Sequence, residues 1–407
     1  MTVGASRAPA RARQQAPPEV VAMGRALVAD LDRLTDLLVE AIVEEDPHYS
    51  GLTTPREDLW RSCSDNLLRV LTVLTGDVDT DDVFDAPRET GSRRAQQGMP
   101  VQSVLHAYRV GFRVIWDGLM TQARHQEGGL EVLAEAATTV WEIVDEFSSS
   151  VGDAYRSTEA SIARRDDRRR EALLDAVLEG RGTDRAVAAD ASAALDLPEH
   201  GRFVVIVLEA SEGGRSGGDA LAVRGLRAVW RARAGRDVGL VSIGRSSPGE
   251  VCAALAVIPA SRAGVSPVVE GLADVDVALR QAETALRALP PGETGVVELD
   301  AGLPGALLVT APDLSARLVH RAIGGVLALE VDERDLLLET LTAWLDTGGS
   351  AGQTASRLYC HRNTVLNRLR RLEALTGRSV ERVDHLVEWS LALLAMRLLP
   401  QDDLPHR

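Results

Sequence analysis

Apolar residues recur at helical spacing through the first 160 residues of the chain. The first such run consists of Val20, Leu27, Leu31, Leu34, Leu38 and Ile42. It predicts a helix that ends at Asp46-Pro47, since proline cannot continue a helix. Further helices are predicted over 55–74 and 100–126, and from Gly129 onward. Four long helices with short connections indicate a helical bundle over residues 19–152. Residues 1–18, rich in Ala, Arg, Pro and Gln, are expected to be a disordered tail.

Residues 153–182 have many charges and few apolar positions, which predicts a solvated connecting helix. Ile162, Leu173, Leu174, Val177 and Leu178 would permit a two-stranded coil, but the run is short in heptads. The glycines at 180 and 182 are expected to end the helix.

The pattern changes over residues 183–315, where short β-branched runs alternate with amphipathic ones. Strands are predicted at 203–208, 238–243, 265–269 and 296–299, and helices at 219–231, 250–255 and 274–289. This alternation predicts a ferredoxin-like α/β domain.

Residues 318–400 are predicted to be helical again. One helix contains Leu318 to Leu327, and the next runs over 334–345 after Asp332 as its cap. Gly348 and Gly349 should stop it. Ser350 and Gln353 have the spacing of a capping box for a short helix from Ala351 to about Leu358. A tight turn over 359–361 and a longer helix from Arg362 to Thr376 follow, and a helix over 384–398 closes the domain.

The longer helix has two different faces. Val365, Leu369 and Leu372 share one face and should point to the core. The opposite side offers base-reading and phosphate-binding side chains, because asparagine pairs with adenine and arginine with guanine in the major groove. The candidate DNA-binding residues are Arg362, Asn363, Thr364, Asn367, Arg368, Arg370 and Arg371. A short helix, a turn and a longer helix of this kind are the arrangement of a helix-turn-helix.

The charge distribution supports this interpretation. The chain carries a net charge of −15, yet residues 357–378 hold six arginines and one acid, Glu373. A helical hairpin with a solvated arginine face is the alternative, but an ordinary exposed face mixes glutamate with arginine. Arg357 and Arg378 are therefore expected to bind phosphates, together with Arg362 and Arg368.

Composition excludes several other classes of protein. The chain has no run of eighteen apolar residues and no apolar leader, so we expect a cytoplasmic protein without a membrane partner. Cys63, Cys252 and Cys360 match no zinc spacing, and no cofactor or metal is predicted. His106, Tyr108, Arg109 and Trp116 lie together on one predicted helix. This group suggests two interpretations. One is a haem or ligand site, and the other, more common one is a histidine that simply packs among apolar residues.

Three stretches resemble known families. The C-terminal sequence, with HRNTV at 361–365 followed by RLRRLEALTG, is similar to the helix-turn-helix of PucR-type transcriptional regulators. Relatives usually have Arg-Tyr after HRNTV, whereas this chain has Leu366-Asn367, so we expect its base preference to differ from theirs. Residues 183–315, with ADVDVALRQAETALRAL, resemble the GGDEF-like domain of CdaR- and PucR-type regulators. The stretch GMPVQSVLHAYRVGFRVIWDGL resembles the helical domain of RsbR-type stress-signalling proteins. These resemblances imply a multidomain α and α/β regulator.

Three functions remain open at this point. The first is a dimeric regulator that binds double-stranded DNA and responds to an effector or partner. The second is an RsbR-like interaction scaffold that does not bind DNA. The third is a nucleotide cyclase or phosphodiesterase. The missing Gly-Gly-Asp/Glu-Glu-Phe motif and the lack of a clustered set of metal-binding carboxylates oppose it, and the glycines at 213–214 and 217–218 lack the following Glu-Phe. The central domain is therefore expected to be non-catalytic.

Overall fold

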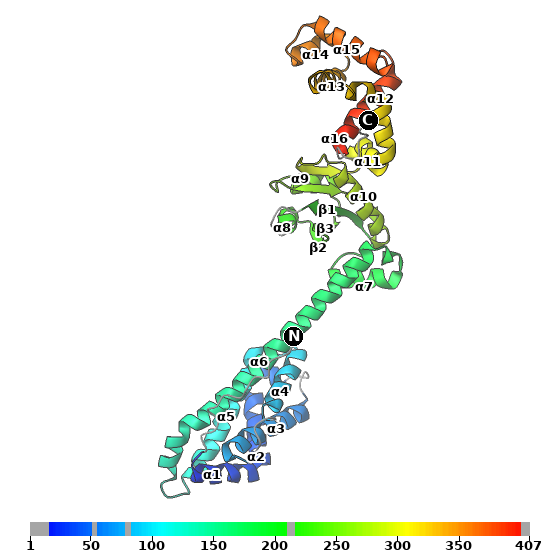
Figure 1. Ribbon diagram of the computed structural model, residues 1–407. Helices are drawn as coiled ribbons and strands as arrows, with labels where there is room; N and C mark the ends of the chain where they lie inside the picture. The colour runs from blue at the N-terminus through cyan, green and yellow to red at the C-terminus, as the bar shows by residue number, and fades with distance from the viewer. Residues whose placement is uncertain (1–15, 51–54, 78–82, 210–215, 400–407) are drawn as a thin grey trace. The chain divides into compact units, whose positions relative to one another are not determined.

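The structure is a computed structural model that describes residues 16–50, 55–77, 83–209 and 216–399 (Figure 1). The chain divides into two compact units, residues 1–167 and residues 168–407. Among the described residues, no helix combines the length and the apolar character needed to cross a bilayer. Residues 1–15 of the expected tail lie outside the described residues, and the first helix begins at Pro18.

The first unit is entirely helical in its described part. Its helices are α1 (Pro18–Ala29), α2 (Leu31–Glu45), α3 (Arg56–Thr75), α4 (Asp85–Gln96), α5 (Val101–Ala123) and the first part of α6 (Gly129–Leu178), with a 3-10 turn at Pro47–Tyr49. Helices α1 and α2 both pack against α3 and α5. One aliphatic core, with Phe147 and Tyr155 from α6, joins them. The helical fold predicted for this part of the chain is confirmed.

Two details of this unit differ from the prediction. The first predicted helix is broken at Asp30, whose φ of −112° and ψ of 27° end α1 before α2 begins. The apolar period continues across the break, so the sequence pattern gave no sign of it. Helix α4 was not predicted, because it buries Thr90, Gly91 and Arg94 in place of large apolar residues.

Helix α6 is a single helix of 50 residues. Val151 and Tyr155 belong to the core of the first unit, and Leu174, Val177 and Leu178 to a core of the second. Residues 161–172 between them are almost all exposed. The prediction of a charged, solvated helix there agrees with the structure, and Gly180, with a φ of 87°, follows its end.

The second unit contains a sheet and two groups of helices. The strands are β1 (Arg202–Glu209), β2 (Arg227–Arg233), β3 (Arg236–Ser242), β4 (Arg262–Val265), β5 (Val269–Glu270) and β6 (Gly295–Glu298). Their order is β2-β3-β1-β4-β6, with β5 on β1. All pairs are antiparallel except β4 with β6, which α10 (Val275–Arg287) connects. The β1-α-β2-β3-α-β4 part is the predicted ferredoxin-like arrangement.

Strand β1 is apolar on both faces because helices cover both. Phe203, Val205 and Val207 pack in one core with α6, α10 and α7 (Arg185–Leu195). The alternate residues, including Val204 and Ile206, pack with α8 (Ser216–Ala222) and α9 (Pro248–Leu255). A continuous apolar run is what a strand buried on two sides requires.

Two predictions in this region are wrong. The strand expected at 265–269 is not formed, because β4 ends at Val265 and β5 begins only at Val269. Residues 219–231 were expected to form one helix, but α8 ends at Ala222 and β2 begins at Arg227. Strand β2 is fixed by its pairing with β3, which places Trp230 opposite Gly239. The two strands form a hairpin with Ala234 and Gly235 as its turn, and this pairing overrides local helix propensity.

The C-terminal helices are α11 (Leu303–Thr310), α12 (Pro312–Leu327), α13 (Val331–Asp346), α14 (Ala351–Arg357), α15 (Arg362–Thr376) and α16 (Val383–Leu398). They share one core, in which Trp389 is fully buried and donates from Nε1 to the carbonyl of Ala322 at 3.2 Å. Asp332 does not cap α13, since Glu330 holds the N-cap position and makes no side-chain cap bond. Helix α11 was not predicted.

Candidate nucleic-acid interface

The predicted helix-turn-helix consists of α14 and α15, and a well-defined backbone turn precedes each of them. After α13, Gly348 and Gly349 have φ values of 63° and 82°. Their amides donate to the carbonyls of Leu345 and Trp344, which satisfies the end of the helix in a Schellman motif. Ser350 then caps α14, because its Oγ accepts a hydrogen bond from the amide of Gln353 at 3.4 Å. Only this half of the expected capping box is formed.

The turn between α14 and α15 repeats the same motif without glycine. Tyr359 takes a left-handed φ of 51°, and the amide of Cys360 donates to the carbonyl of Ala355 at 3.0 Å. The side chain of Tyr359 is 98% exposed. His361 follows as the N-cap of α15, and its Nδ1 accepts from the amide of Asn363 at 3.2 Å.

The inner face of α15 fixes the helix on the domain. Val365, Leu369 and Leu372 are buried, as the spacing predicted. Gly325 of α12 permits close contact from the other side, because a Cβ there would lie 2.2 Å from the carbonyl oxygen of Leu375. Gly377, with a φ of 67°, follows the helix, as expected for its last turn.

The outer face of α15 carries the polar side chains that the sequence singled out. Asn363, Asn367 and Arg370 are all exposed. Arg370 donates from Nη1 to Oδ1 of Asn367 at 3.3 Å, so these two side chains act as a pair. Arg362 is exposed at the first turn, and Thr364 beside it is half-buried. This surface, defined by Arg362, Asn363, Asn367 and Arg370, is called the reading face below.

Two of the predicted arginines on α15 also contact α13. Arg368 is half-buried and donates to Oγ1 of Thr340 at 3.3 Å. Arg371 lies at the edge of the helix, where its Nε is 3.1 Å from Oε1 of Glu333. Both side chains therefore have partners within the protein.

Arg378 has a structural role in place of the expected phosphate contact. Its side chain is only 9% exposed, pairs with Glu388 and donates to the carbonyl of Arg321 at 2.7 Å. Hydrogen bonding from Arg378 lowers the pKa of Glu388. Arg357 also has an acidic partner, Asp346, at 2.9 Å. Of the six arginines in residues 357–378, Arg357, Arg371 and Arg378 thus have acidic partners within the domain.

The single acid in the basic segment points to the domain's own backbone. Oε1 of Glu373 accepts a hydrogen bond from the amide of Val380 at 2.9 Å. Glu373 thus holds the turn after α15 and lies away from the reading face. Sequence reasoning missed Tyr359, since a turn residue gave no signal that its ring would stand in solvent next to the first turn of α15.

The central domain contains no cluster of three or more potential metal ligands among its described residues. Gly217 and Gly218 lie at the start of α8, against Trp230. Gly213 and Gly214 lie outside the described residues. Arg231 and Arg233 of β2 instead form ion pairs with Asp175 at the end of α6.

The cluster expected on the third predicted helix is divided between two environments. His106 is partly exposed, and its Nε2 lies 3.3 Å from a carboxylate oxygen of Glu45. Tyr108 points inward and donates to Oδ1 of Asn66 at 2.7 Å. The imidazole of His106 thus contacts a partly exposed carboxylate, whereas Tyr108 belongs to the interior of the unit.

Comparison with known proteins gives three family matches in series. Residues 32–170 match the RsbT co-antagonist protein rsbRD N-terminal domain, residues 179–288 the GGDEF-like domain, and residues 337–395 the PucR C-terminal helix-turn-helix domain. The chain is 32% identical over 138 residues to the purine catabolism regulatory protein of Bacillus subtilis, covering 33% of this chain and 26% of that protein. It therefore spans about a quarter of the length of this curated relative.

A solved structure, the regulator of polyketide synthase expression from Bifidobacterium adolescentis, is 24% identical and covers 56% of this chain and 92% of that one. Its TM-score is 0.30. The three domain matches occur in the order that the sequence motifs predicted. In series along the chain, these regions thus match an RsbRD-type helical domain, a GGDEF-like domain and a PucR-type helix-turn-helix domain, the three resemblances that the sequence predicted.

Proposed function

We propose that this protein is a transcriptional regulator that binds double-stranded DNA through α15. The observation that carries the proposal is the division of this helix into two faces. Val365, Leu369 and Leu372 anchor one face, while Asn363, Asn367 and Arg370 stand in solvent on the other. A recognition helix needs this combination of a fixed position and free base-reading side chains.

The side chains of the reading face have separate roles. Asn363 and Asn367 can each bridge the N6 and N7 positions of adenine, and Arg370 can bridge O6 and N7 of guanine. The hydrogen bond between Arg370 and Asn367 would hold both groups in register before DNA arrives. Arg362 and Tyr359 flank the first turn of α15, where the helix dipole and free amides favour a phosphate. Thr364, Arg368 and Arg371 are proposed to add backbone contacts at the edges.

We further propose that the protein acts as a homodimer in the cytoplasm. A two-fold axis would place two copies of α15 in successive major grooves, about one helical turn apart. The upstream domains would then control DNA binding by α15 in response to a small-molecule effector or a protein partner. They would not catalyse a reaction of their own. The segment in which Arg231 and Arg233 hold Asp175 would connect α6 to the sheet of the central domain.

The test uses the full chain and a selected cognate site. Arg370→Ala should weaken binding to the cognate duplex about 10- to 100-fold, because one bidentate base contact is worth about 1–3 kcal/mol. Binding to random duplex should change much less. Arg397→Ala on α16 removes the same charge outside the reading face and is the matched control. Equal losses on cognate and random DNA would mean that Arg370 meets only phosphate.

A second candidate function is an interaction scaffold without DNA binding. It is favoured by the match of residues 32–170 to an RsbRD domain, the longest of the three matched regions. The two candidates differ in one measurement. A reader of DNA must show an affinity that falls steeply with salt concentration, whereas a scaffold of this kind would show no such affinity.

A further inference from the structure

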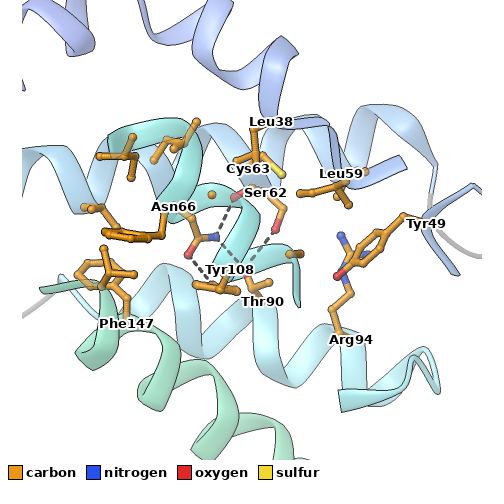
Figure 2. Close-up of a pocket in the computed structure, with 18 residues that line it drawn as sticks. Leu38, Tyr49, Leu59, Ser62, Cys63, Asn66, Thr90, Arg94, Tyr108 and Phe147 are labelled. Atoms are coloured by element: carbon orange, nitrogen blue, oxygen red, sulfur yellow. Dashed lines mark hydrogen bonds between the residues drawn. The ribbon is translucent and has the colours of Figure 1, made fainter. Parts of the chain in front are cut away.

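The first helical unit encloses a cavity that the proposed DNA reader does not use. Its volume is about 60 Å³, and it is lined by residues from α2, α3, α4, α5 and α6 together with Tyr49. Figure 2 shows polar side chains in the middle of the lining, Phe147 at one end, and Arg94 with Tyr49 at the other. Well-packed interiors have few voids larger than one water molecule, so this cavity calls for an occupant.

The arginine end of the cavity is engaged by the protein itself. The guanidinium of Arg94 lies over the ring of Tyr49, 5.7 Å from the ring centroid, and donates to Oε1 of Gln97 at 2.8 Å. Burial raises the pKa of the Cys63 thiol to about 12 and raises the pKa of Tyr49 and of Tyr108, so these groups are neutral at physiological pH. The occupant must therefore be matched to a lining that is neutral away from the arginine.

The amide of Asn66 has a fixed orientation in the middle of the cavity. Its Nδ2 donates to the carbonyl of Ser62 at 2.8 Å, and because a carbonyl can only accept, this atom must be the nitrogen. The second hydrogen of Nδ2 is donated to Oγ1 of Thr90 at 3.0 Å. Oδ1 therefore faces the hydroxyl of Tyr108 at 2.7 Å, and Tyr108 must be the donor, since an amide oxygen only accepts.

The hydroxyls of Thr90 and Ser62 are fixed in the same way. Thr90 donates its single hydrogen to the carbonyl of Ala86 at 2.8 Å. The hydroxyl of Ser62 lies 3.1 Å from that of Thr90, so Ser62 must donate in this bond. Lone pairs remain on the side-chain oxygens of Tyr108, Ser62 and Asn66. These four side chains thus offer the cavity hydrogen-bond acceptors but no free O–H or N–H.

The end of the cavity opposite the arginine is apolar. Phe147 lies there, across the polar side chains from Arg94 in Figure 2, and Val144 lines the cavity one turn before it on α6. Phe112 lines it one turn after Tyr108 on α5. A buried water needs two to four polar partners, which this end does not offer. A molecule with one donor and a short carbon body satisfies both the middle and this end.

We propose that this cavity binds a small neutral molecule with one hydrogen-bond donor, such as a short alcohol. Its hydroxyl donates to the lone pairs left on Tyr108, Ser62 and Asn66, and its carbon body lies toward Phe112 and Phe147. An engineered apolar cavity of about 150 Å³ holds benzene, so about 60 Å³ suits a molecule of roughly three or four heavy atoms. Ethanol and 2-propanol have this size, whereas cyclohexanol exceeds it.

The experiment compares 2-propanol with acetone on the full chain, without DNA, by ligand-observed NMR titration and by thermal unfolding. The two molecules have nearly the same shape, but only 2-propanol can donate a hydrogen bond. We expect a Kd on the order of 1–10 mM for 2-propanol, given its few atoms. Acetone should bind at least about 10-fold more weakly, because its carbonyl oxygen would face only lone pairs. Cyclohexanol should also bind more weakly than 2-propanol, because the cavity is too small.

The variant Thr90→Val tests the count of donors and acceptors. Valine keeps the shape of threonine but lacks Oγ1, so the hydroxyl of Ser62 and one N–H of Asn66 lose their acceptor. The cavity then offers free donors. Acetone should bind this variant about 5-fold or more tightly than it binds the parent, and the preference for 2-propanol should shrink accordingly. A void that selects only by shape would show the same preference in both proteins.

The variant Gly111→Ala locates the ligand. Its Cβ would fill part of the cavity and meet only Leu38, at 3.7 Å or more. Alanine in a helix interior is more stable than glycine, so this variant should keep or raise the Tm. Its affinity for 2-propanol should fall at least about 5-fold, since so small a cavity has no spare room. Gly152→Ala on α6, outside the lining, is the matched control and should bind 2-propanol normally.

Several results would overturn the proposal. They are equal binding of 2-propanol and acetone by the parent, tighter binding of cyclohexanol, an unchanged preference in Thr90→Val, or an unchanged affinity for 2-propanol in Gly111→Ala. No saturable binding of 2-propanol would mean that the cavity holds only water, which also overturns it. If Thr90→Val does not fold, the ligand pair and Gly111→Ala decide.

The binding of the alcohol does not rest on the proposed function, whereas an effect of the alcohol on gene regulation does. A protein that binds 2-propanol but not DNA would refute only the proposed function. A protein that binds DNA but not 2-propanol would refute only the site in the first helical unit.

Discussion

Arg371 of α15 forms an ion pair with Glu333 of α13, with 3.1 Å between Nε and Oε1. The pair lies at the edge of the reading face, and both side chains are about half exposed. An exposed pair of this kind contributes little stability. It does reduce the positive charge that α15 would offer to a phosphate in the proposed complex with DNA.

This relationship predicts the effect of Glu333→Gln. The substitution frees Arg371, so affinity for both cognate and random duplex should rise, by about 2- to 10-fold at low salt. The slope of log K against log salt should become steeper by about one phosphate contact. Fluorescence anisotropy over a salt series measures both quantities. Glu339→Gln, an exposed acid on the same helix, makes the same change in net charge, and an equal effect there would show a general electrostatic response.

Gly325 is predicted to be essential for the packing of α12 against α15. A Cβ at this position would lie 2.2 Å from the carbonyl oxygen of Leu375, so Gly325→Ala must push α15 away. We expect a loss of about 2–4 kcal/mol in the stability of the C-terminal domain, in the range of a severe core defect. Chemical denaturation followed by circular dichroism measures it.

The adjacent Gly324 is the control. A Cβ there would meet only the ring of His320, at 3.5 Å, so Gly324→Ala should be neutral or stabilising by up to about 1 kcal/mol. Similar losses in both variants would contradict the contact between Gly325 and Leu375.

Glu388 gives the C-terminal domain a pH dependence of known sign. Hydrogen bonding from Arg378 lowers the pKa of Glu388 in the folded state. A carboxyl group with a depressed folded pKa stabilises the protein above its unfolded pKa, which is about 4.3 for glutamate. This stabilisation is lost as the pH falls from about 5 through the folded pKa.

The variant Glu388→Gln should therefore be less stable than the parent at neutral pH. The difference between the two should shrink as the solution is acidified below about pH 4, because protonated glutamate resembles glutamine. Urea midpoints between pH 3 and pH 7 test this. A difference that stays constant over the whole range would argue against the pair as its source.

Tyr359 is predicted to have opposite effects on stability and on DNA binding. Its left-handed φ of 51° is unfavourable for a residue with a Cβ, so Tyr359→Gly should stabilise the turn by roughly 1 kcal/mol. The same change removes an exposed ring beside the first turn of α15, and DNA affinity should fall. Tyr359→Asn also tolerates this backbone conformation and separates the two effects. A gain in stability with unchanged DNA affinity would mean that the ring does not contact DNA.

Sequence alone determined the elements whose signals are local. The apolar spacing of Val365, Leu369 and Leu372 placed α15 and its buried face, since a helix shows its amphipathic pattern within its own residues. The glycines after α13 and α15 marked their ends for the same reason. The motif HRNTV and the order of the three domain resemblances also predicted the matches that were found.

Tertiary structure decided everything that depends on a partner far along the chain. Helix α4 is stable because its small and polar residues pack on α3 and α5. Arg357, Arg371 and Arg378 lie in the same basic segment as Arg370, and the sequence does not distinguish them from it. In the folded domain, each of the three is paired with an acid from another segment. The cavity beside Arg94 also has no sequence pattern, because its lining comes from five helices whose residues meet only in the folded unit. Packing is a long-range property, and local sequence patterns do not contain it.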